Sequence, residues 1–372
     1  MSLFALRGKL SRKQSIGLGL AGFAILILVW WVLAERLSVQ RPVYEDYETN
    51  LPSIIQDDEN GTPIDRDSIA RADSLKLANA TEFEKVYPLL PPPDRVLKAF
   101  PTLYSEDEVV SNTVLSVWRN VQGYFWAIFL SIPIGFVIGL LPIFRGLFSK
   151  QVDALRYLPL TALTGLFIVW FGIEEKMKVA FLAFGIIVYL LPVVVQRIDE
   201  VKDVYLKTVF TLGANKWQTI RSVYIPSVMA KLIDDIRVLT AISWTYIIIA
   251  ELLNRQGGLG ALIWFKTKQG QLEKVFAILI VIIAIGFLQD RIFVYLDKRL
   301  FPHKYYKTSV VGIKEVEYGV YSILGVLTLA ILLAAIFSGL PGFLGSLVWI
   351  VVIAALIIIF YGEFKVQRAL TD

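Results

Sequence analysis

The polar segment Lys207–Pro226 offers the chemistry of recognition rather than of bond making. Its sequence, KTVFTLGANKWQTIRSVYIP, lies between two apolar stretches. It carries three cations that lipid would not tolerate without a polar partner, Lys207, Lys216 and Arg221. Three apolar residues recur in it at helical spacing, Trp217, Ile220 and Val223. Because tryptophan is a frequent interface anchor, the segment predicts an amphipathic docking helix that ends at Pro226. The alternative is a solvated connector with Trp217 among the lipid headgroups.

Side chains that catalyse reactions are scarce in this chain. It has no cysteine and one histidine, His303, so thiol chemistry, zinc sites and Ser-His-Asp catalysis lack their usual parts. No G-x-x-x-x-G-K-[ST] sequence occurs, which excludes a P-loop nucleotide site. The acid nearest the middle of an apolar stretch is Glu251, which we expect to pair with Arg255, with an aqueous path as the alternative. We therefore expect no catalytic residues, no metal and no cofactor.

The composition indicates a membrane protein. Of 372 residues, 56% are hydrophobic and 19% are charged, against about 25% charged residues in soluble domains. Eight apolar stretches approach or reach the ~20 residues that cross a bilayer as a helix. They are predicted near residues 16–34, 121–142, 157–172, 177–195, 238–253, 275–289, 318–338 and 343–361. The first exceeds the length of a signal-peptide core and no A-x-A site follows it, so we expect it to remain as a helix.

The distribution of charge predicts how the chain crosses the membrane. Residues 196–237 hold seven basic side chains and residues 290–314 hold six, whereas residues 35–112 hold sixteen acids against eight bases. Lysine and arginine concentrate on the cytoplasmic side of membrane proteins. We therefore expect the two basic segments and both termini in the cytoplasm, and residues 35–112 outside. The net charge of +5 then reports topology and not a nucleic-acid partner.

Residues 35–112 form the largest polar block of the chain. From Gln40 to Pro93 no helical or strand period is sustained, which favours a loop with short helical pieces over a domain with its own core. One such piece is expected at residues 66–79. Residues 56–67 loosely match a calcium-binding EF-hand loop, but their first and last positions are Gln56 and Asp67, so we expect a solvated acidic turn.

The segment Lys207–Pro226 resembles the coupling motif of permease subunits of bacterial ATP-binding-cassette importers. That motif reads E-A-A, three residues, Gly, nine residues, I-x-L-P. Its last four fixed positions correspond here to Gly213, Val223, Ile225 and Pro226. Its first three positions hold Lys207, Thr208 and Val209 instead of E-A-A. The resemblance implies that an ATPase contacts the residues Gly213, Ala214, Trp217, Val223, Ile225 and Pro226.

Further stretches are similar to the nitrate/sulfonate/taurine-type permeases of that class and follow the expected order over about residues 90–302. They are Leu90–Val96, an S-x-x-R-x-x-x-G pattern at Ser116, Arg119 and Gly123, then Ile132–Gly139, Trp170–Gly172, Arg237, Ala250–Glu251 and Gly258–Gly260. The chain departs from the pattern at Gly165, where proline is usual, and at Ala230–Lys231, which replaces a Pro-Gly pair.

The resemblance implies an all-α, polytopic membrane helix bundle with a type I importer-like core of six spans. The last two spans would add a C-terminal hairpin. We expect four segments: a cytoplasmic N-terminus with the first span (1–34), an acidic extracytoplasmic loop (35–112), the permease core (113–302) and the C-terminal extension (303–372).

The implied function is that of a transmembrane permease subunit of an ATP-driven importer in a bacterial inner membrane, for a small anionic or polar solute. The implied partners are separate ATPase subunits, an extracytoplasmic solute-binding protein and a second permease subunit, as a homodimer. Candidate residues of the translocation path are Thr161, Thr164, Ser243, Thr245, Tyr246 and Glu251. The alternatives are an ion-driven secondary transporter, for which no repeat is visible, and a polytopic membrane enzyme, for which clustered catalytic side chains are missing.

Overall fold

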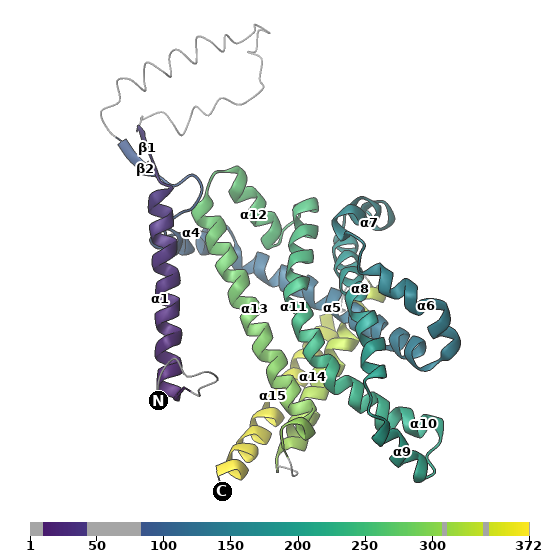
Figure 1. Cartoon of the computed structure of the whole chain (residues 1–372). Helices are drawn as coiled ribbons and strands as arrows, with labels where there is room; N and C mark the ends of the chain where they lie inside the picture. Colours follow the sequence, from purple (N-terminus) through teal and green to yellow (C-terminus); the bar gives the residue numbers. More distant parts are fainter. Residues whose placement is uncertain (1–9, 43–82, 307–310, 338–341, 372) are drawn as a thin grey trace. The chain divides into compact units, whose positions relative to one another are not determined.

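The computed structural model describes residues 10–42, 83–306, 311–337 and 342–371, and nearly all of them are helical (Figure 1). Among the described residues, seven single helical spans are long and apolar enough to cross a bilayer. They are formed by α1 (Arg12–Arg36), α5 (Val109–Leu140), α8 (Glu175–Asp199), α10 (Lys216–Thr219) continuing into α11 (Ile225–Asn254), α13 (Leu272–Leu300), α14 (Ile313–Phe337) and α15 (Gly342–Thr371). A bent helix pair makes an eighth candidate. The predicted all-α polytopic bundle with about eight spans is confirmed.

The third predicted span, residues 157–172, is not one straight helix. The chain forms α6 (Pro142–Leu155), a 3-10 turn at Leu160–Leu163 and then α7 (Thr164–Phe171), with a bend of 96° between the two halves. Pro159 precedes the 3-10 turn; it lacks an amide hydrogen and keeps the residue before it out of the helical region. The predicted span at residues 157–172 is therefore helical only from Leu160 to Phe171, and it forms a broken span or a re-entrant loop together with α6, which the hydropathy did not predict.

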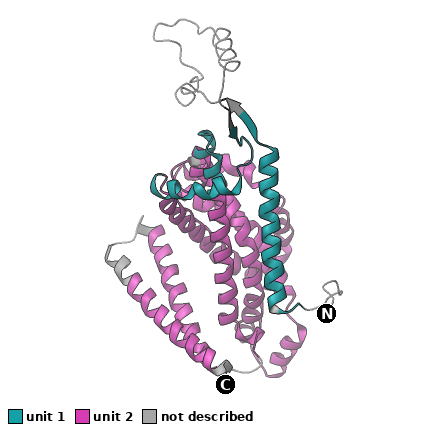
Figure 2. Cartoon of the chain, turned by 90° about the vertical axis from the view of Figure 1, so that its left-hand side faces the viewer, with its two compact units in different colours: residues 1–106, 266–277 teal, residues 107–265, 278–372 magenta. Residues whose placement is uncertain are grey.

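The chain divides into two compact units, drawn in different colours in Figure 2. The first comprises residues 1–106 and 266–277. In it, β1 (Val39–Pro42) pairs antiparallel with β2 (Phe83–Val86), and the short helices α3 (Pro93–Lys98) and α4 (Phe100–Ser105) follow. The Trp30 indole donates to the carbonyl of Pro91 at 3.0 Å, which joins α1 to this polar part. The strand pair was not predicted, and the predicted features at residues 56–67 and 66–79 lie outside the described residues.

The second unit, residues 107–265 and 278–372, is built around α5, α8 and α11. Small residues let α5 and α8 approach closely. A Cβ atom placed at Gly123 would lie 2.5 Å from the side chain of Leu182, and one at Gly135 would lie 2.5 Å from Val194. Glycine at these positions therefore permits the tight packing on which a membrane helix pair depends. These close contacts fix the register of α5 against α8, and therefore the positions of the polar side chains that the two helices carry.

The helices α14 and α15 pack along each other as an antiparallel pair, as the predicted C-terminal hairpin requires. Lys365 pairs with Glu315 at 2.8 Å between the two helices. Glu363 of α15 also accepts a hydrogen bond from the Tyr295 hydroxyl at 2.7 Å and pairs with Arg299. The hairpin is thus joined to α13 by charged and polar contacts at its base.

Candidate functional site

The predicted coupling segment folds as two short helices joined by a glycine turn. The first, α9 (Asp203–Thr211), ends before Gly213, whose φ of +76° is a left-handed conformation that favours glycine. A Cβ atom there would meet nothing within 4 Å, so backbone conformation and not space explains the glycine. Asn215 then caps α10: its side chain accepts from the amide of Gln218 at 2.8 Å, and the Gln218 side chain accepts from the amide of Asn215. This capping box fixes where the second helix begins.

The prediction that this helix ends at Pro226 is wrong. After α10 the chain makes a π-helical turn, Ile220–Tyr224, and runs directly into α11. In this turn the amide of Ile225 donates to the carbonyl of Ile220. A π turn is wider than an α turn, and Pro226 lies in the first turn of α11, where its missing amide hydrogen costs least. The segment is therefore continuous with a membrane span, so a force on it can reach α11 directly.

Large apolar side chains of this turn are exposed at the protein surface. Trp217 is 66% exposed, Phe210 82% and Leu212 79%. We name the exposed face of residues 203–221 the coupling surface. Of the other predicted contact residues, Ile225 and Pro226 are exposed and Ala214 is half-buried, whereas Val223 is buried and supports the helix. Sequence reasoning missed Phe210 and Leu212; their apolar character directly before Gly213 was the available signal.

A set of ion pairs joins the end of α8 to α11 just before the coupling surface begins. Arg197, in the last turn of α8, pairs with Asp235 of α11 at 2.7 Å and with Glu200 at 2.7 Å. Lys231 pairs with Glu200 at 2.9 Å. Hydrogen bonds from Lys231 and then Arg197 lower the pKa of Glu200 to about 2. Since α9 starts only three residues after Glu200, these contacts fix the point from which the coupling surface extends.

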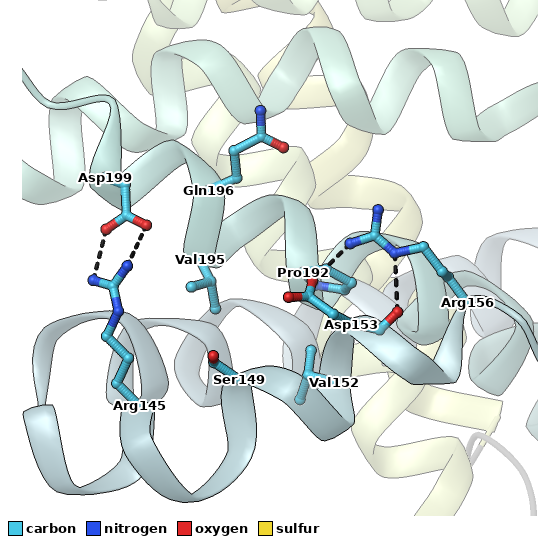
Figure 3. Close-up of a pocket in the computed structure, with 9 residues that line it drawn as sticks. All are labelled: Arg145, Ser149, Val152, Asp153, Arg156, Pro192, Val195, Gln196 and Asp199. Carbon is cyan, nitrogen blue, oxygen red and sulfur yellow. Dashed lines mark hydrogen bonds and ion pairs between the residues drawn. The ribbon is translucent and has the colours of Figure 1, made fainter.

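A small cavity of about 270 Å³ lies near the same end of α8, between it and α6 (Figure 3). Arg145 pairs with Asp199 through a 2.7 Å hydrogen bond, and Arg156 pairs with Asp153 at 2.7 Å. Each arginine is thus neutralised by an acid. The cavity therefore presents paired charges and is not a site for an anion.

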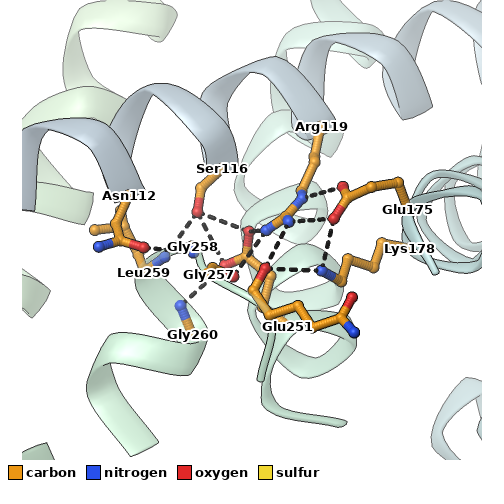
Figure 4. A network of polar contacts seen from close by, with 11 residues as sticks. Asn112, Ser116, Arg119, Glu175, Lys178, Glu251, Gly257, Gly258, Leu259 and Gly260 are labelled. Carbon is orange, nitrogen blue, oxygen red and sulfur yellow. Dashed lines mark hydrogen bonds and ion pairs between the residues drawn. The ribbon is translucent and has the colours of Figure 1, made fainter. Parts of the chain in front are cut away.

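A buried polar cluster joins α5, α8, α11 and the loop that follows α11 (Figure 4). At its centre the Arg119 side chain, only 2% exposed, pairs with the fully buried Glu251 at 2.8 Å and with Glu175. Arg119 also donates to the carbonyls of Gly257 and Gln256 at 2.9 and 3.0 Å. We name these residues, with Ser116, Lys178 and residues 258–260, the Arg119 cluster.

The backbone after α11 is shaped to complete this cluster. Arg255, Gly257 and Gly258 all have positive φ, and a Cβ atom at Gly258 would lie 2.2 Å from a Glu251 carboxylate oxygen. The amide of Leu259 donates to the Ser116 hydroxyl at 2.8 Å, and the amide of Gly260 donates to Glu251 at 2.9 Å. The start of α12 (Leu259–Lys268) thereby satisfies the second carboxylate oxygen of Glu251.

The expected pair between Glu251 and Arg255 does not form. The guanidinium of Arg255 lies over the Trp264 ring, 3.5 Å from its centroid, while Glu251 binds Arg119, which is 132 residues away in sequence. The left-handed conformation of Arg255 ends α11 and turns its side chain away from Glu251. In the sequence, Arg119 belongs to the S-x-x-R-x-x-x-G pattern, and nothing near it in the chain indicates that it pairs with Glu251.

The other predicted path residues occupy different environments. Ser243 is buried and accepts from the Asn120 amide at 3.0 Å, and Thr245 is exposed. Tyr246 is half-buried and packs against the cluster of Leu160, Phe167 and Phe181. Thr164 donates to the carbonyl of Thr161 at 2.8 Å. The structure thus brings Tyr246 near the Thr161–Thr164 segment through an apolar cluster, while Ser243 and Glu251 are engaged in buried hydrogen bonds.

Comparison with known proteins points to one class. Residues 131–302 match the family described as binding-protein-dependent transport system inner membrane component. The taurine transport system permease protein TauC of Escherichia coli is 27% identical over 218 residues, which cover 57% of this chain and 79% of the relative. The putative aliphatic sulfonates transport permease protein SsuC of Bacillus subtilis is 28% identical over 215 residues, covering 57% and 77%. The bicarbonate transport system permease protein CmpB of Synechocystis is 25% identical over 203 residues, covering 51% and 68%.

Proposed function

Because the chain belongs to the inner-membrane permease subunits of binding-protein-dependent importers, of the nitrate/sulfonate/taurine type, we propose that its coupling surface is driven by a separate ATPase chain. The chain is a multi-pass membrane protein and a transport subunit of an ATP-driven importer. The observation that carries the proposal is the exposed apolar group of Trp217, Phe210 and Leu212, with Val204 and Tyr205 also exposed on the same surface. Soluble surfaces seldom expose such a group unless a partner covers it.

The geometry supports a mechanical role for this surface. Its second helix continues through the π turn into α11, and α11 ends at Glu251 and the Arg119 cluster. A movement imposed on Trp217 by an ATPase would therefore pass along one helix through the membrane. We propose that this helix takes two positions during transport and that the ATPase biases them by binding one better than the other.

The cargo that we propose is a small anionic or polar solute, delivered outside the membrane by a solute-binding protein. Relatives of this chain are named for taurine, aliphatic sulfonates and bicarbonate, all of which are small and polar or charged. We propose that two copies of the chain line the path as a homodimer in the inner membrane, with both termini in the cytoplasm. The exposed Thr245 and half-buried Tyr246 remain our candidate path residues, and binding of solutes to the co-encoded external protein tests the cargo.

A substitution experiment tests the coupling assignment. Trp217→Glu and Gly213→Glu, separately and together, are expected to abolish ATP-dependent uptake while the protein stays inserted in the membrane. Trp217→Glu removes the apolar anchor, and a side chain at the left-handed Gly213 position strains the turn by about 1–2 kcal/mol. Uptake is measured in cells that also produce the ATPase and the binding protein, and capture of the ATPase on the purified permease is measured beside it.

The matched control is Tyr104→Glu, which changes another exposed aromatic residue, 73% accessible, on α4. It is expected to leave ATPase capture unchanged. Wild-type uptake and ATPase capture in the Gly213→Glu/Trp217→Glu double variant would sink the assignment of this surface.

A further inference from the structure

A large cavity lies among α5, α7, α8 and the end of α14 in the second unit. Its volume is about 1070 Å³, as large as sites that hold small organic molecules. None of the predicted path residues lines it. It is distinct from the coupling surface, and it shares only Glu175 and the Gln256 backbone region with the Arg119 cluster.

The cavity has the length of one membrane leaflet. Its wall on α5 is a single stripe of residues four apart, Trp118, Gln122, Trp126 and Leu130. Its wall on α8 extends from Glu175 to Ile187. Each stripe covers twelve residue steps, about 18 Å at 1.5 Å per residue. The hydrocarbon core of a bilayer is ~30 Å thick, so each wall is slightly longer than one half of it.

The two ends of the cavity differ in chemistry. Its deeper walls are apolar and aromatic, with Trp126, Leu130, Phe184 and Ile187. Its other end carries Glu174, Lys176 and Gln256, beside Trp118 and Trp170. Tryptophan is enriched at the depth of lipid headgroups. Water or a polar solute would find few hydrogen-bond partners among the deeper walls, whereas a hydrocarbon chain loses nothing there.

The polar end of the cavity carries the acid Glu174 and the base Lys176 at its rim. Glu174 and Lys176 are both exposed, and within the part of the chain that the structure describes their side chains make no hydrogen bond or ion pair. Their neighbour Glu175, in contrast, is held by Arg119 and Lys178. The positions of Glu174 and Lys176, two residues apart on the rim, match a headgroup that carries a phosphate and an ammonium.

We propose that this cavity is a binding site for one phosphatidylethanolamine molecule of the bilayer. An acyl chain lies between the aromatic walls of α5 and α8, Lys176 binds the lipid phosphate and Glu174 accepts hydrogen bonds from the ammonium. The ammonium group of the ethanolamine headgroup has N–H donors for Glu174. The quaternary ammonium of choline has none, and the glycerol headgroup has no cation. The site therefore prefers phosphatidylethanolamine to phosphatidylcholine, and both to phosphatidylglycerol. The proposal does not depend on the transport function.

Native mass spectrometry of the purified full-length chain tests the proposal, with 1-palmitoyl-2-oleoyl lipids of the three headgroups added in turn. One phosphatidylethanolamine is expected to bind about tenfold more tightly than phosphatidylglycerol, the ratio that one charge-assisted hydrogen bond supplies. Glu174→Gln is expected to remove this preference. Lys176→Gln is expected to weaken the binding of all three lipids, because each has a phosphate.

Two further variants separate a built site from general lipid adhesion. Ala334→Trp places a large ring at the cavity wall of α14. Because the ring occupies the space of the acyl chain, the binding of all three lipids is expected to weaken about tenfold. Lys150→Gln removes an exposed lysine remote from the cavity and is expected to change nothing. Equal binding of the three lipids, or equal binding by wild type and Ala334→Trp, would overturn the proposal. Exclusive occupation of the cavity by an α-helix of a second copy, seen as loss of lipid on dimerisation, would overturn it too.

Discussion

Arg119 illustrates what a guanidinium requires inside a membrane bundle. It lies on α5 at 2% exposure, and two carboxylates and two backbone carbonyls accept its hydrogen bonds. Its planar guanidinium donates hydrogen bonds to several acceptors at once in a fixed geometry, which a lysine ammonium cannot reproduce. The cluster therefore locks the ends of α5, α8 and α11 to one another.

Removal of the Arg119 side chain should reveal the free-energy cost of leaving Glu251 buried without an ion-pair partner. We expect Arg119→Met to lower the free energy of unfolding by about 3–5 kcal/mol, because Glu251 would remain buried and unpaired. Thermal unfolding in detergent micelles measures the loss. Arg145→Met, which breaks the half-exposed pair with Asp199, should cost less than about 1 kcal/mol. Equal losses in the two variants would contradict a special role for the Arg119 cluster.

Glu200 predicts a pH dependence at the base of the coupling surface. Its pKa falls from 4.5 to about 2 in the folded chain, so its ion pairs stabilise the fold fully above about pH 4.5 and are lost as the pH falls through 2. The side chain is 33% exposed, so we expect a contribution of only about 1 kcal/mol after solvent screening. Unfolding midpoints of wild type and Glu200→Gln should differ at pH 6 and converge near pH 2. A constant difference across this range would contradict the assignment.

At the scale of elements, the α14–α15 pair depends on two glycines. A Cβ atom at Gly319 would lie 2.5 Å from Ile359, and one at Gly362 would lie 2.6 Å from the Val316 side chain and 2.9 Å from its amide nitrogen. Leucine at either position should force the helices apart and cost about 1–3 kcal/mol. Gly325 has nothing within 4 Å of such an atom, so Gly325→Leu is the matched control.

The chain has no cysteine, so cross-linking of two introduced cysteines by a short bis-maleimide can report this separation. Glu315→Cys and Lys365→Cys place one thiol on each helix, at two positions whose long side chains now meet in an ion pair at 2.8 Å. We expect rapid cross-linking in this background, slower cross-linking with Gly319→Leu or Gly362→Leu, and no change with Gly325→Leu. Undiminished cross-linking in the Gly362→Leu variant would show that the helices do not depend on close approach.

The elements that the sequence predicts well are those with a local cause. Long apolar runs identify the spans, and Gly213 marks the turn between α9 and α10. The break at Pro159 and the π turn before Pro226 depend on how a proline is accommodated, which hydropathy does not report. The partner of Glu251 could not be found from neighbours in sequence, because it is Arg119 of α5, 132 residues away, which the packing of α5 against α11 brings to Glu251.

At the scale of the whole molecule, we expect the coupling surface and the region of α3 and α4 to lie on opposite sides of the membrane. The coupling surface can meet an ATPase only in the cytoplasm, and the basic residues around it favour that side. The region of α3 and α4 belongs to the acidic block that the same rule places outside. The charge pattern and the coupling function thus require the same topology, which can be measured without any assay of transport.

Single cysteines in this cysteine-free chain test that topology. Tyr104 is 73% exposed and Leu212 is 79% exposed, so Tyr104→Cys and Leu212→Cys should react equally well with a maleimide that reaches them. In spheroplasts, a membrane-impermeant maleimide should label Tyr104→Cys at once and Leu212→Cys only after permeabilisation. Because the two sites are similarly accessible, a difference in labelling reports the side of the membrane and not burial. The reverse pattern would place the coupling surface outside the cell, where no ATP is available, and would remove the basis of the proposed coupling.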